Sequence, residues 1–319
     1  MTQWLKKNWF LLGLIAVAAL PLMDLTGVTV DAGRWLKANH GPDIIIVLIF
    51  FLSGLALNTS QIRAGFADYQ GTLLALVVIF LVSPIVAVGF SALPLSTGVL
   101  IGLLLVAAMP TTLSSGVVMS GAAGGNMAHA LLITIIANSL AVVTIPVTLE
   151  LLLAFAGQEK EVVIDQLPIM LKIAKLVLLP LILGIVIRNK CGTWVQPILP
   201  YTSILNQTGI LTVVWMASCQ GREAIVGSLG SVPLVIALTF AFHLVLVLIA
   251  LFATGLTGIG KGRRESVILM GGQKTLPLSI ILQVSLFPEY GLALVVCVLH
   301  HITHLAMDGF LVQYLKEKR

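Results

Sequence analysis

The sequence predicts an all-α membrane protein with ten transmembrane helices, arranged as two inverted repeats of five, and three observations lead to this fold class. Of the 319 residues, 58% are hydrophobic and only 10% are charged, and the mean hydropathy is +1.08, whereas soluble domains are about one quarter charged. The apolar residues gather in segments of a length, roughly 20 residues, that crosses a bilayer. Two of these segments are interrupted at corresponding places by proline, glycine and polar side chains.

Ten apolar segments follow one another along the chain with short connections. They lie at residues 9–23, 43–57, 72–93, 97–119, 128–156, 167–188, 202–218, 231–255, 266–286 and 290–314. The first is similar to a secretory signal, because Lys6 and Lys7 precede an apolar run that ends in small residues. Further spans with the same charge pattern follow it, so we interpret it as a retained first helix.

Basic residues in the connections predict the orientation, since Lys and Arg are retained on the cytoplasmic side of a membrane. One set of connections is rich in them, namely Lys6, Lys7, Arg63, Arg188, Lys190, Lys261, Arg263, Arg264, Lys316, Lys318 and Arg319. The opposite set holds only Arg34, Lys37, Lys160 and Arg222, together with the acidic segment QEKEVVID at 158–165. We therefore expect both termini on the cytoplasmic side of the membrane, which we expect to be a bacterial inner membrane.

The acidic segment divides the chain into two halves, residues 1–157 and 158–319, and each half contains five apolar segments. Because five is an odd number, the two halves enter the membrane from opposite sides. Inverted repeats of secondary transporters are built in this way.

Several functional classes are excluded by composition and by motif. The net charge of +5 does not indicate nucleic-acid binding, because the basic residues lie in short loops beside the spans. Cys191, Cys219 and Cys297 are too scattered for a metal site or a disulfide framework. No P-loop, zinc or Ser-His-Asp signature is present, so we expect no catalytic residues, no metal and no ATP-driven pumping by this chain alone.

The fourth and ninth segments differ from ordinary spans. They contain VAAMPTTLSSGVVMSGAAGG at 106–125 and GGQKTLPLS at 271–279. Proline frees main-chain carbonyls that must find partners in a dry environment, which is tolerated where the broken backbone lines a cavity. Taken singly, each segment can be a proline kink with Ser and Thr bonded back to their own helix. As a pair in opposed halves, they indicate a transport site in which half-helix ends face ion and substrate.

At these motifs the sequence resembles the bile acid:sodium symporters, solute carrier family ten, and among them the SBF-like branch. The resemblance covers nearly the whole chain through the ten-span layout. Its specific parts are PTTLSSGVVMSGAAGGN at 110–126, GGQKTLPLS at 271–279 and VLHHITH at 298–304. It implies a panel domain of the first, second, sixth and seventh spans and a core domain of the others, in which two helices cross at unwound centres.

The resemblance also implies roles for single residues. Ser115 and Thr134 match sodium ligands of the family, and Gln273 matches the glutamine of its ninth span. Two positions depart from the pattern: Leu269 stands where the symporters carry a glutamate shared by two sodium sites, and Gly116 stands at the asparagine of the fourth span. Sodium and protons therefore remain alternative coupling ions.

Lys274 is the charged residue of the ninth span, where no Asp or Glu accompanies it. An intramembrane charge is a functional hypothesis by default, and three roles are open: a built-in cation that opposes half-helix dipoles, an anchor for an anionic substrate, or a titrating group. The remaining alternative is that its amine snorkels to an interface. Oxygen ligands for a hard cation are offered nearby by Thr111, Thr112, Ser114, Ser115, Thr134, Asn138, Gln273 and Thr275.

The tenth span contains HHITHLAMD, in which His300, His301, His304 and Asp308 share one helical face. The resemblance implies that His300 and His301 match a His-Asn pair that faces the substrate cavity. A histidine-dependent membrane enzyme is the alternative, although the other histidines, His40, His129 and His243, are far apart in sequence. We interpret Asn206, Gln207 and Thr208 as an interfacial cap that opens the seventh span.

These observations together predict a secondary active transporter that moves a small organic anion by alternating access, coupled to Na⁺ or H⁺. Its partners are the anion, the ion and the lipid bilayer, with no nucleic acid and no cofactor besides Na⁺ as a possible coupling ion. We predict substrate binding at Thr111, Thr112, Lys274, Thr275, His300 and His301, and ion binding or coupling at Ser114, Ser115, Thr134, Asn138, Gln273 and Lys274. A regulatory membrane protein that has the carrier fold without sodium coupling is the other alternative.

Overall fold

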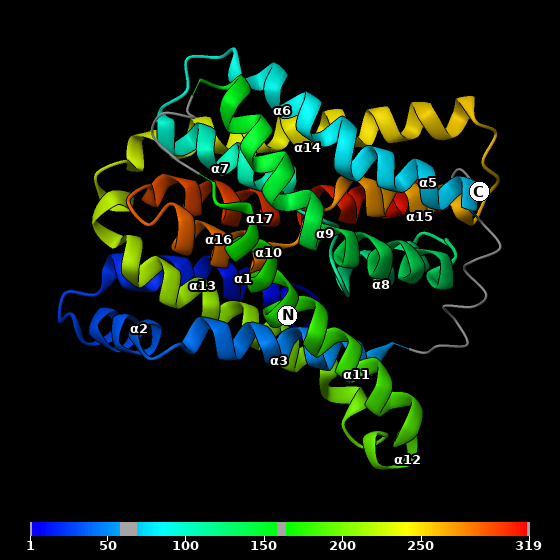
Figure 1. Ribbon diagram of the computed structural model, residues 1–319, viewed down its shortest axis with the longest axis horizontal. Helices are drawn as coiled ribbons and strands as arrows, with labels where there is room; N and C mark the ends of the chain where they lie inside the picture. The colour runs from blue at the N-terminus through cyan, green and yellow to red at the C-terminus, as the bar shows by residue number, and fades with distance from the viewer. Residues whose placement is uncertain (1, 58–68, 158–163, 318–319) are drawn as a thin grey trace.

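The computed structural model describes residues 2–57, 69–157 and 164–317, with side chains from Trp9 onward (Figure 1). Within these ranges the regular secondary structure is entirely helical, as the composition predicts. The boundary proposed between the halves, most of the acidic segment, and the loop and terminal residues Arg63, Lys160, Lys318 and Arg319 lie outside the described residues. The side chains of Lys6 and Lys7 also lie outside them.

Each predicted apolar segment coincides with one helix or with consecutive helices. In chain order these are α1 (Thr2–Met23), α3 (Gly41–Ala56), α5–η1–α6 (Tyr69–Val77, Val78–Val82, Ser83–Ser91), α7 with α8 (Thr97–Ala108, Ser115–Ala122), α9 (Met127–Phe155), α10–η2–α11 (Gln166–Ile173, Ala174–Leu178, Leu179–Lys190), α13 (Thr202–Val226), α14 (Val232–Leu256), α15 with α16 (Arg263–Gly272, Leu276–Leu286) and α17 (Gly291–Glu317). The connections contain α2 (Val28–Ala38), α12 (Gly192–Val195) and the short 3₁₀ helices η3 (Leu199–Tyr201) and η4 (Leu229–Ser231).

Several of these helices can cross a bilayer by length and composition. In the described part of the chain six qualify, or seven if Trp9–Met23 and Val28–Ala38, which meet at 110°, count as one bent span. Gly41–Ala56 and Thr97–Ala108 are apolar but shorter, and the latter is short because the helix stops before Pro110. The chain is therefore a multi-pass membrane protein.

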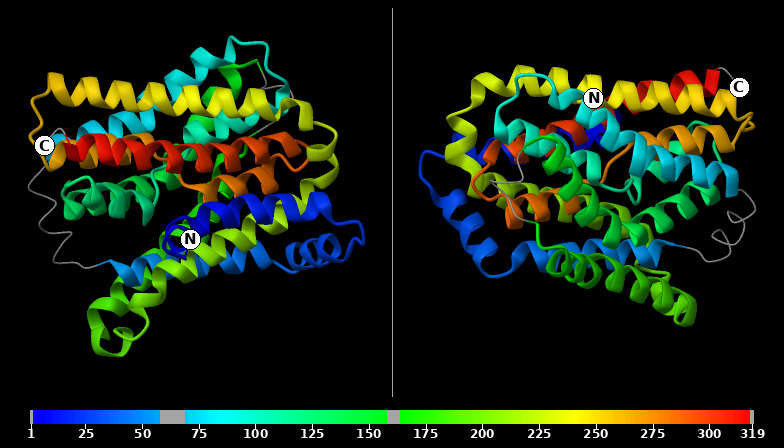
Figure 2. Two further views of the ribbon diagram at one scale, coloured as in Figure 1. Left: turned by 180° about the vertical axis from the view of Figure 1, so that it is seen from behind. Right: turned by 45° about the horizontal axis from the view of Figure 1, so that its top comes forward.

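The helices form two groups that pack against each other. In Figures 1 and 2, α1, α3, α11 and α13 lie together on one side of the molecule, with α5, α6, α7, α14, α15 and α17 on the other. Glycines bring two helices of the first group close together: a Cβ at Gly54 of α3 would lie 2.2 Å from the carbonyl of Leu181 on α11. Small residues at helix crossings allow such backbone contact in membranes.

In the second group of helices, a proline leaves one main-chain carbonyl without a donor from its own helix. In η1, a π-helical turn, the N–H of Ser83 bonds the carbonyl of Val78, five residues earlier. In that register the next donor would be Pro84, which has no N–H to offer the carbonyl of Ile79. The Ile79 carbonyl must therefore find a donor elsewhere.

Candidate functional site

Both predicted helix breaks are present, and they meet. The main chain is extended at Met109 (φ −73°, ψ 147°), before Pro110, and again at Gln273 (φ −74°, ψ 147°). The residue before a proline is disfavoured from the helical region, which explains the first break. At the second, Pro277 occupies the first turn of α16, where its missing N–H costs no bond. The N–H of Thr275 donates to the carbonyl of Pro110 at 2.9 Å, so the two breaks are directly bonded.

Lys274 is buried at this crossing, with 2% of its surface exposed. Its ammonium donates to three main-chain carbonyls, those of Ile79 at 2.9 Å, Met109 at 3.0 Å and Ala107 at 3.3 Å. The lysine thus supplies the donor that Pro84 withholds from Ile79 and places a cation at the carboxyl end of α7, where the helix dipole is negative. The snorkelling alternative is wrong, because the amine does not reach the surface.

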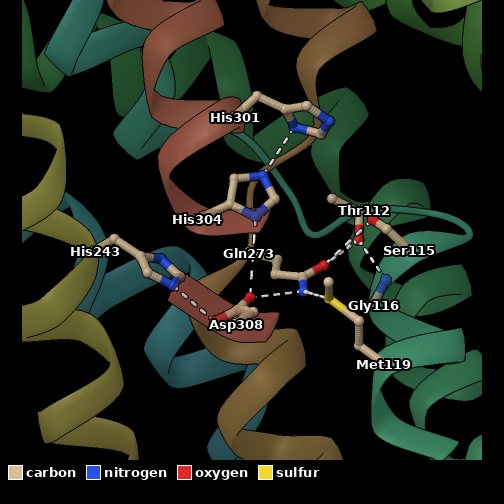
Figure 3. A network of polar contacts seen from close by, with 9 residues as sticks. All are labelled: Thr112, Ser115, Gly116, Met119, His243, Gln273, His301, His304 and Asp308. Carbon is tan, nitrogen blue, oxygen red and sulfur yellow. Dashed lines mark hydrogen bonds and ion pairs between the residues drawn. The ribbon is translucent and has the colours of Figure 1, made fainter. Parts of the chain in front are cut away.

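Gln273 connects the two broken helices through its side chain. Its Oε1 accepts from the hydroxyls of Thr112 at 2.7 Å and Ser115 at 3.4 Å (Figure 3). Its Nε2 donates to Oδ2 of Asp308 on α17 at 2.7 Å. The amide orientation follows from these partners, because a carboxylate only accepts.

Thr134 and Asn138 of α9 donate hydrogen bonds to the main chain of the first break. The Thr134 hydroxyl donates to the carbonyl of Thr112 at 3.3 Å, and the Asn138 amide donates to the carbonyl of Thr111, also at 3.3 Å. Oγ1 of Thr111 and Oδ1 of Asn138 are buried without a hydrogen-bond partner. The predicted ion-binding residues are therefore brought together around the breaks.

A pocket of about 40 Å³ lies between the two helix groups, room for a few water molecules. It is lined by Phe10, Ile49, Ser53, Thr112, Leu113, Ser114, Ser115, Asn206, Gln207, Ile210, Thr275, Leu276, Pro277 and His301. Predicted residues on this lining are Thr112, Ser114, Ser115, Thr275 and His301. Those that the structure leaves off the lining are Thr111, Thr134, Asn138, Gln273, Lys274 and His300.

His300 points to a different neighbourhood from that of His301. Its ring packs on Phe242 and His243 of α14, with ring centroids 5.7 and 6.0 Å away. His301 instead packs against Phe10 of α1 at 6.1 Å and lines the pocket. Of the two histidines expected to face one cavity, only His301 lines this pocket in this conformation.

The sequence interpretation missed two further groups of residues. Asn206, expected to be an interfacial cap, is buried and donates to the Ser53 hydroxyl at 2.9 Å in the pocket wall. His243, set aside because it is distant in sequence, bonds Oδ1 of Asp308 at 2.9 Å. One signal was available for the latter: a carboxylate inside a span is itself a functional indication, and Asp308 was the only one in the tenth span's histidine motif.

No group of His, Cys, Asp and Glu suited to a metal ion occurs among the described residues. Two of the histidines of α14 and α17, His243 and His304, face the Asp308 carboxylate instead, and the imidazole rings pack against one another.

Comparisons with known proteins connect this site to a family. The model of the SBF-like CPA transporter family matches residues 8–317. A probable chloroplastic sodium/metabolite cotransporter, BASS4, of Arabidopsis thaliana is 32% identical over 83% of this chain, which spans 63% of that protein's length. The BASS4 of Oryza sativa subsp. indica is 28% identical over 98% of this chain and 76% of its own, and sodium/bile acid cotransporter 7-A of Xenopus laevis is 26% identical over 99% and 94%.

The family model is that of a transporter family and these relatives are named as cotransporters, which gives no support to the enzyme alternative. The family match extends over nearly the whole chain, including both broken helices and the histidine motif of α17. The chain belongs to the SBF-like CPA transporter family, within the bile acid:sodium symporters that its motifs resemble.

Proposed function

We propose that the protein is a secondary active transporter that moves a small organic anion across a bacterial inner membrane by alternating access, driven by Na⁺ or H⁺. The observation that carries this proposal is the bonded crossing of two broken helices beside a pocket. Such discontinuous helices at the interface of two repeats are the usual site of substrate and coupling ion in these carriers. The proposal includes ten spans in two inverted repeats, 1–157 and 158–319, with both termini in the cytoplasm.

The packing of the helices supports a division into two moving parts. The group α1, α3, α11 and α13 corresponds to the proposed panel, and the remaining spans to the core that carries the crossing. The pocket takes residues from both, for instance Ile210 from the panel and Thr275 from the core. A rocking of one group against the other would open the pocket to either side, and the small cavity indicates that an organic anion requires such a movement.

The electrostatics of the crossing favour an anion. The amino-terminal ends of α8 and α16 both reach the pocket, through Ser114 and Ser115 at the first and Thr275 and Leu276 at the second. Helix amino termini carry partial positive charge and bind carboxylates and phosphates. The lining has no Asp or Glu to neutralise them, whereas the negative carboxyl end of α7 already holds the Lys274 ammonium. The three donors of Lys274 are used by carbonyls in this conformation, so the lysine does not bind the anion directly. It favours an anion because its charge offsets the negative end of α7.

Two coupling ions fit different parts of the site. The sodium cotransporters among the relatives favour Na⁺, and Thr111 and Asn138 offer buried oxygens without partners. The Lys274 ammonium already occupies the carbonyls that would attract a cation at the end of α7, which favours H⁺.

Exchange of organic anions in proteoliposomes tests the proposal. Taurocholate and a panel of smaller carboxylates and sulfonates are loaded inside, and uptake of the labelled compound from outside is followed. We expect exchange by the wild type and its loss in Ile210→Trp, which fills the pocket. Ile204→Trp is the matched control, because Ile204 lies on the same helix but is 50% exposed. Absence of exchange by the wild type across the panel would contradict the proposal and favour a regulatory membrane protein.

A further inference from the structure

The side chains around Asp308 form a series of contacts that begins and ends in the pocket and has one gap, between His304 and Asp308. From the pocket lining, His301 Nδ1 lies 2.8 Å from Nε2 of His304, and Nδ1 of His304 faces Oδ2 of Asp308 at 4.0 Å. Asp308 accepts from Gln273, whose carbonyl holds the hydroxyls of Thr112 and Ser115 on the opposite pocket wall. Figure 3 shows these contacts crossing from α17 to the two broken helices.

The hydrogen-bond partners determine where the protons of this network are. Nε2 of His304 has a partner, Nδ1 of His301, whereas Nδ1 of His304 is buried without a partner among the described residues. A neutral imidazole carries a single N–H, and a buried N–H needs an acceptor, so a neutral His304 carries its proton on Nε2 and donates it to Nδ1 of His301. His304 in its neutral form then has a lone pair on Nδ1, and this nitrogen has no hydrogen-bond partner.

The carboxylate oxygen Oδ2 of Asp308 faces that lone pair and is itself an acceptor. An ionised Asp308 has only lone pairs, so Nδ1 of His304 and Oδ2 of Asp308 face each other without a proton between them. A donor so near a buried carboxylate would close to a hydrogen-bond distance of about 2.7–2.9 Å, whereas the observed separation is 4.0 Å. The gap therefore has the geometry of two acceptors that lack a shared proton.

The other neighbours of Asp308 do not supply this proton. His243 donates from Nε2 to Oδ1 of Asp308, while its Nδ1 is buried without a partner. That arrangement is suited to the neutral imidazole, because a protonated ring would leave a buried N–H unpaired. Asp308 is thus a buried carboxylate held by two hydrogen bonds, from Gln273 and from His243.

The surroundings contain few other groups that titrate. Besides His243, His301 and His304 the described ionisable groups near the network are His300 and Cys297 on α17, Lys274 at the break, and Arg263, Arg264 and Glu265 in the first turn of α15. The helices α7, α8 and α16 carry none, and neither does α1 from Trp9 on. On α13, Cys219, Arg222 and Glu223 lie toward the end at which α17 begins, since Gly291 packs on Ala224.

We propose that His304 and Asp308 together form a binding site for one proton, connected to the pocket through His301 and Gln273, and that this proton is the coupling ion of the carrier. On loading, a proton from pocket water binds to Nδ1 of His304 or to Oδ2 of Asp308, and the new N–H or O–H donates a hydrogen bond to the other atom. On unloading, the proton returns to water on the other side of the membrane. A second proton is disfavoured, because two positively charged rings would repel each other, and the ring centroids of the four imidazoles lie 4.5–6.0 Å from their neighbours.

Loading this site would be transmitted to the crossing by Gln273. A charge-assisted hydrogen bond to a carboxylate is about twice as strong as a neutral one. When the proton neutralises Asp308, the bond from Nε2 of Gln273 weakens, and the same amide holds Thr112 and Ser115 of the other broken helix. Proton binding and the arrangement of the pocket are therefore expected to be linked.

Nitrogen NMR of the imidazoles, in protein labelled at histidine and reconstituted in nanodiscs, tests the proton site without any substrate. Signals are assigned with His→Gln variants, and His40, whose side chain is 83% exposed, is the matched control. We expect His304 to pass from one bound proton to two as the pH falls, and Asp308→Asn to shift or remove this transition while His40 titrates as in the wild type. A His304 that stays neutral at every pH at which the protein is folded, or that titrates identically in Asp308→Asn, would overturn the proton site.

The role of the proton in coupling rests on the proposed function and is tested separately. Proteoliposomes that exchange an anion are given an inward proton gradient without sodium, and then a sodium gradient at equal pH. We expect accumulation only with the proton gradient, loss of that accumulation in Asp308→Asn, its partial recovery in Asp308→Glu, and wild-type behaviour in His40→Gln. Accumulation driven by sodium alone, or unchanged in Asp308→Asn, would overturn the coupling role. Failure of the wild type to exchange any anion would count against the transport function and leave the NMR result to decide the proton site.

Discussion

The main-chain N–H of Thr275 donates to the main-chain carbonyl of Pro110 at 2.9 Å, which joins two helix breaks that are far apart in sequence. Each break supplies what the other lacks. The end of α7 and Pro110 present main-chain carbonyls, of which that of Ala107 also accepts from the Ser83 hydroxyl, and the segment after Gly272 presents the Thr275 amide and the Lys274 ammonium. The crossing is therefore a single hydrogen-bonded unit, and its parts can be tested one at a time.

Replacement of Lys274 by methionine should abolish anion exchange and lower stability. The aliphatic stem is largely conserved, but the carbonyls of Ile79 and Met109 lose their side-chain donor, while that of Ala107 keeps the Ser83 hydroxyl. Leaving buried acceptors unsatisfied costs about 1–3 kcal/mol, which thermal unfolding in detergent can measure. Lys172→Met is the control, because this exposed amine bonds only the Ser285 hydroxyl. Exchange that survives in Lys274→Met with its pH dependence intact would contradict a central role for the lysine.

The hydroxyls of Thr112 and Ser115, which both donate to Gln273, should differ in how much they contribute to stability. Thr112 donates to Gln273 at 2.7 Å and accepts from the N–H of Gly116 at 3.0 Å, whereas Ser115 makes one bond of 3.4 Å. We expect Thr112→Val to cost about 1–3 kcal/mol, because it removes the acceptor of the Gly116 N–H and leaves the Gln273 oxygen only the longer bond from Ser115, and Ser115→Ala to cost less. Thr112→Ser keeps the hydroxyl and should restore most of the loss. Equal thermal shifts for Thr112→Val and Ser115→Ala would show that the bond to Gln273 does not hold the break.

The contact between α3 and α11 depends on glycine. A Cβ at Gly184 would lie 2.3 Å from the carbonyl of Phe51, a main-chain atom that cannot move alone. Gly184→Ala should therefore separate the helices and destabilise the protein by about 1–3 kcal/mol, as overpacking does. Gly89→Ala, where nothing lies within 4 Å, should be neutral or slightly stabilising. Thermal unfolding of both variants checks this, and equal midpoints would contradict the close packing.

Asp24, in the turn between α1 and α2, should make the start of α2 sensitive to acid. Hydrogen bonds from the hydroxyls of Thr29 and Thr26, and from main-chain N–H groups that include Val30, hold the pKa of its carboxyl well below the usual range. Because the folded pKa is depressed, the stabilisation is present above the unfolded pKa, about 3.9, and is lost as the pH falls through the folded value. Hydrogen exchange of the Thr29 and Val30 amides checks this: protection at neutral pH should fall in Asp24→Ala, and acid should have little further effect in that variant. Protection that is the same in Asp24→Ala and wild type would contradict the cap.

Much of the fold could be predicted from local sequence, because helices and breaks have local causes. Apolar runs gave the helix positions, and Pro110 and Pro277 gave the two interruptions. Contacts between helices could not be predicted in this way. His243 and Asp308 are 65 residues apart, and Ser53 and Asn206 are 153 apart; which faces meet depends on how the helices pack, and a helical period does not specify this. The carbonyl of Ile79 was missed for a related reason, since a main-chain acceptor exposed by a proline has no side-chain signature.

The accessibility of a single cysteine at position 114 shows whether the pocket beside the crossing opens alternately to the two sides of the membrane. Cys191, Cys219 and Cys297 are replaced, Ser114→Cys is introduced in the pocket lining, and a membrane-impermeant thiol reagent is applied to either side of oriented vesicles. A chain that retains only the exposed Cys191 serves as the control and should react from one side. We expect the cysteine at position 114 to react from both sides, and an anion that is exchanged to slow the reaction. Reaction from one side only, under every gradient and with every anion tested, would contradict alternating access.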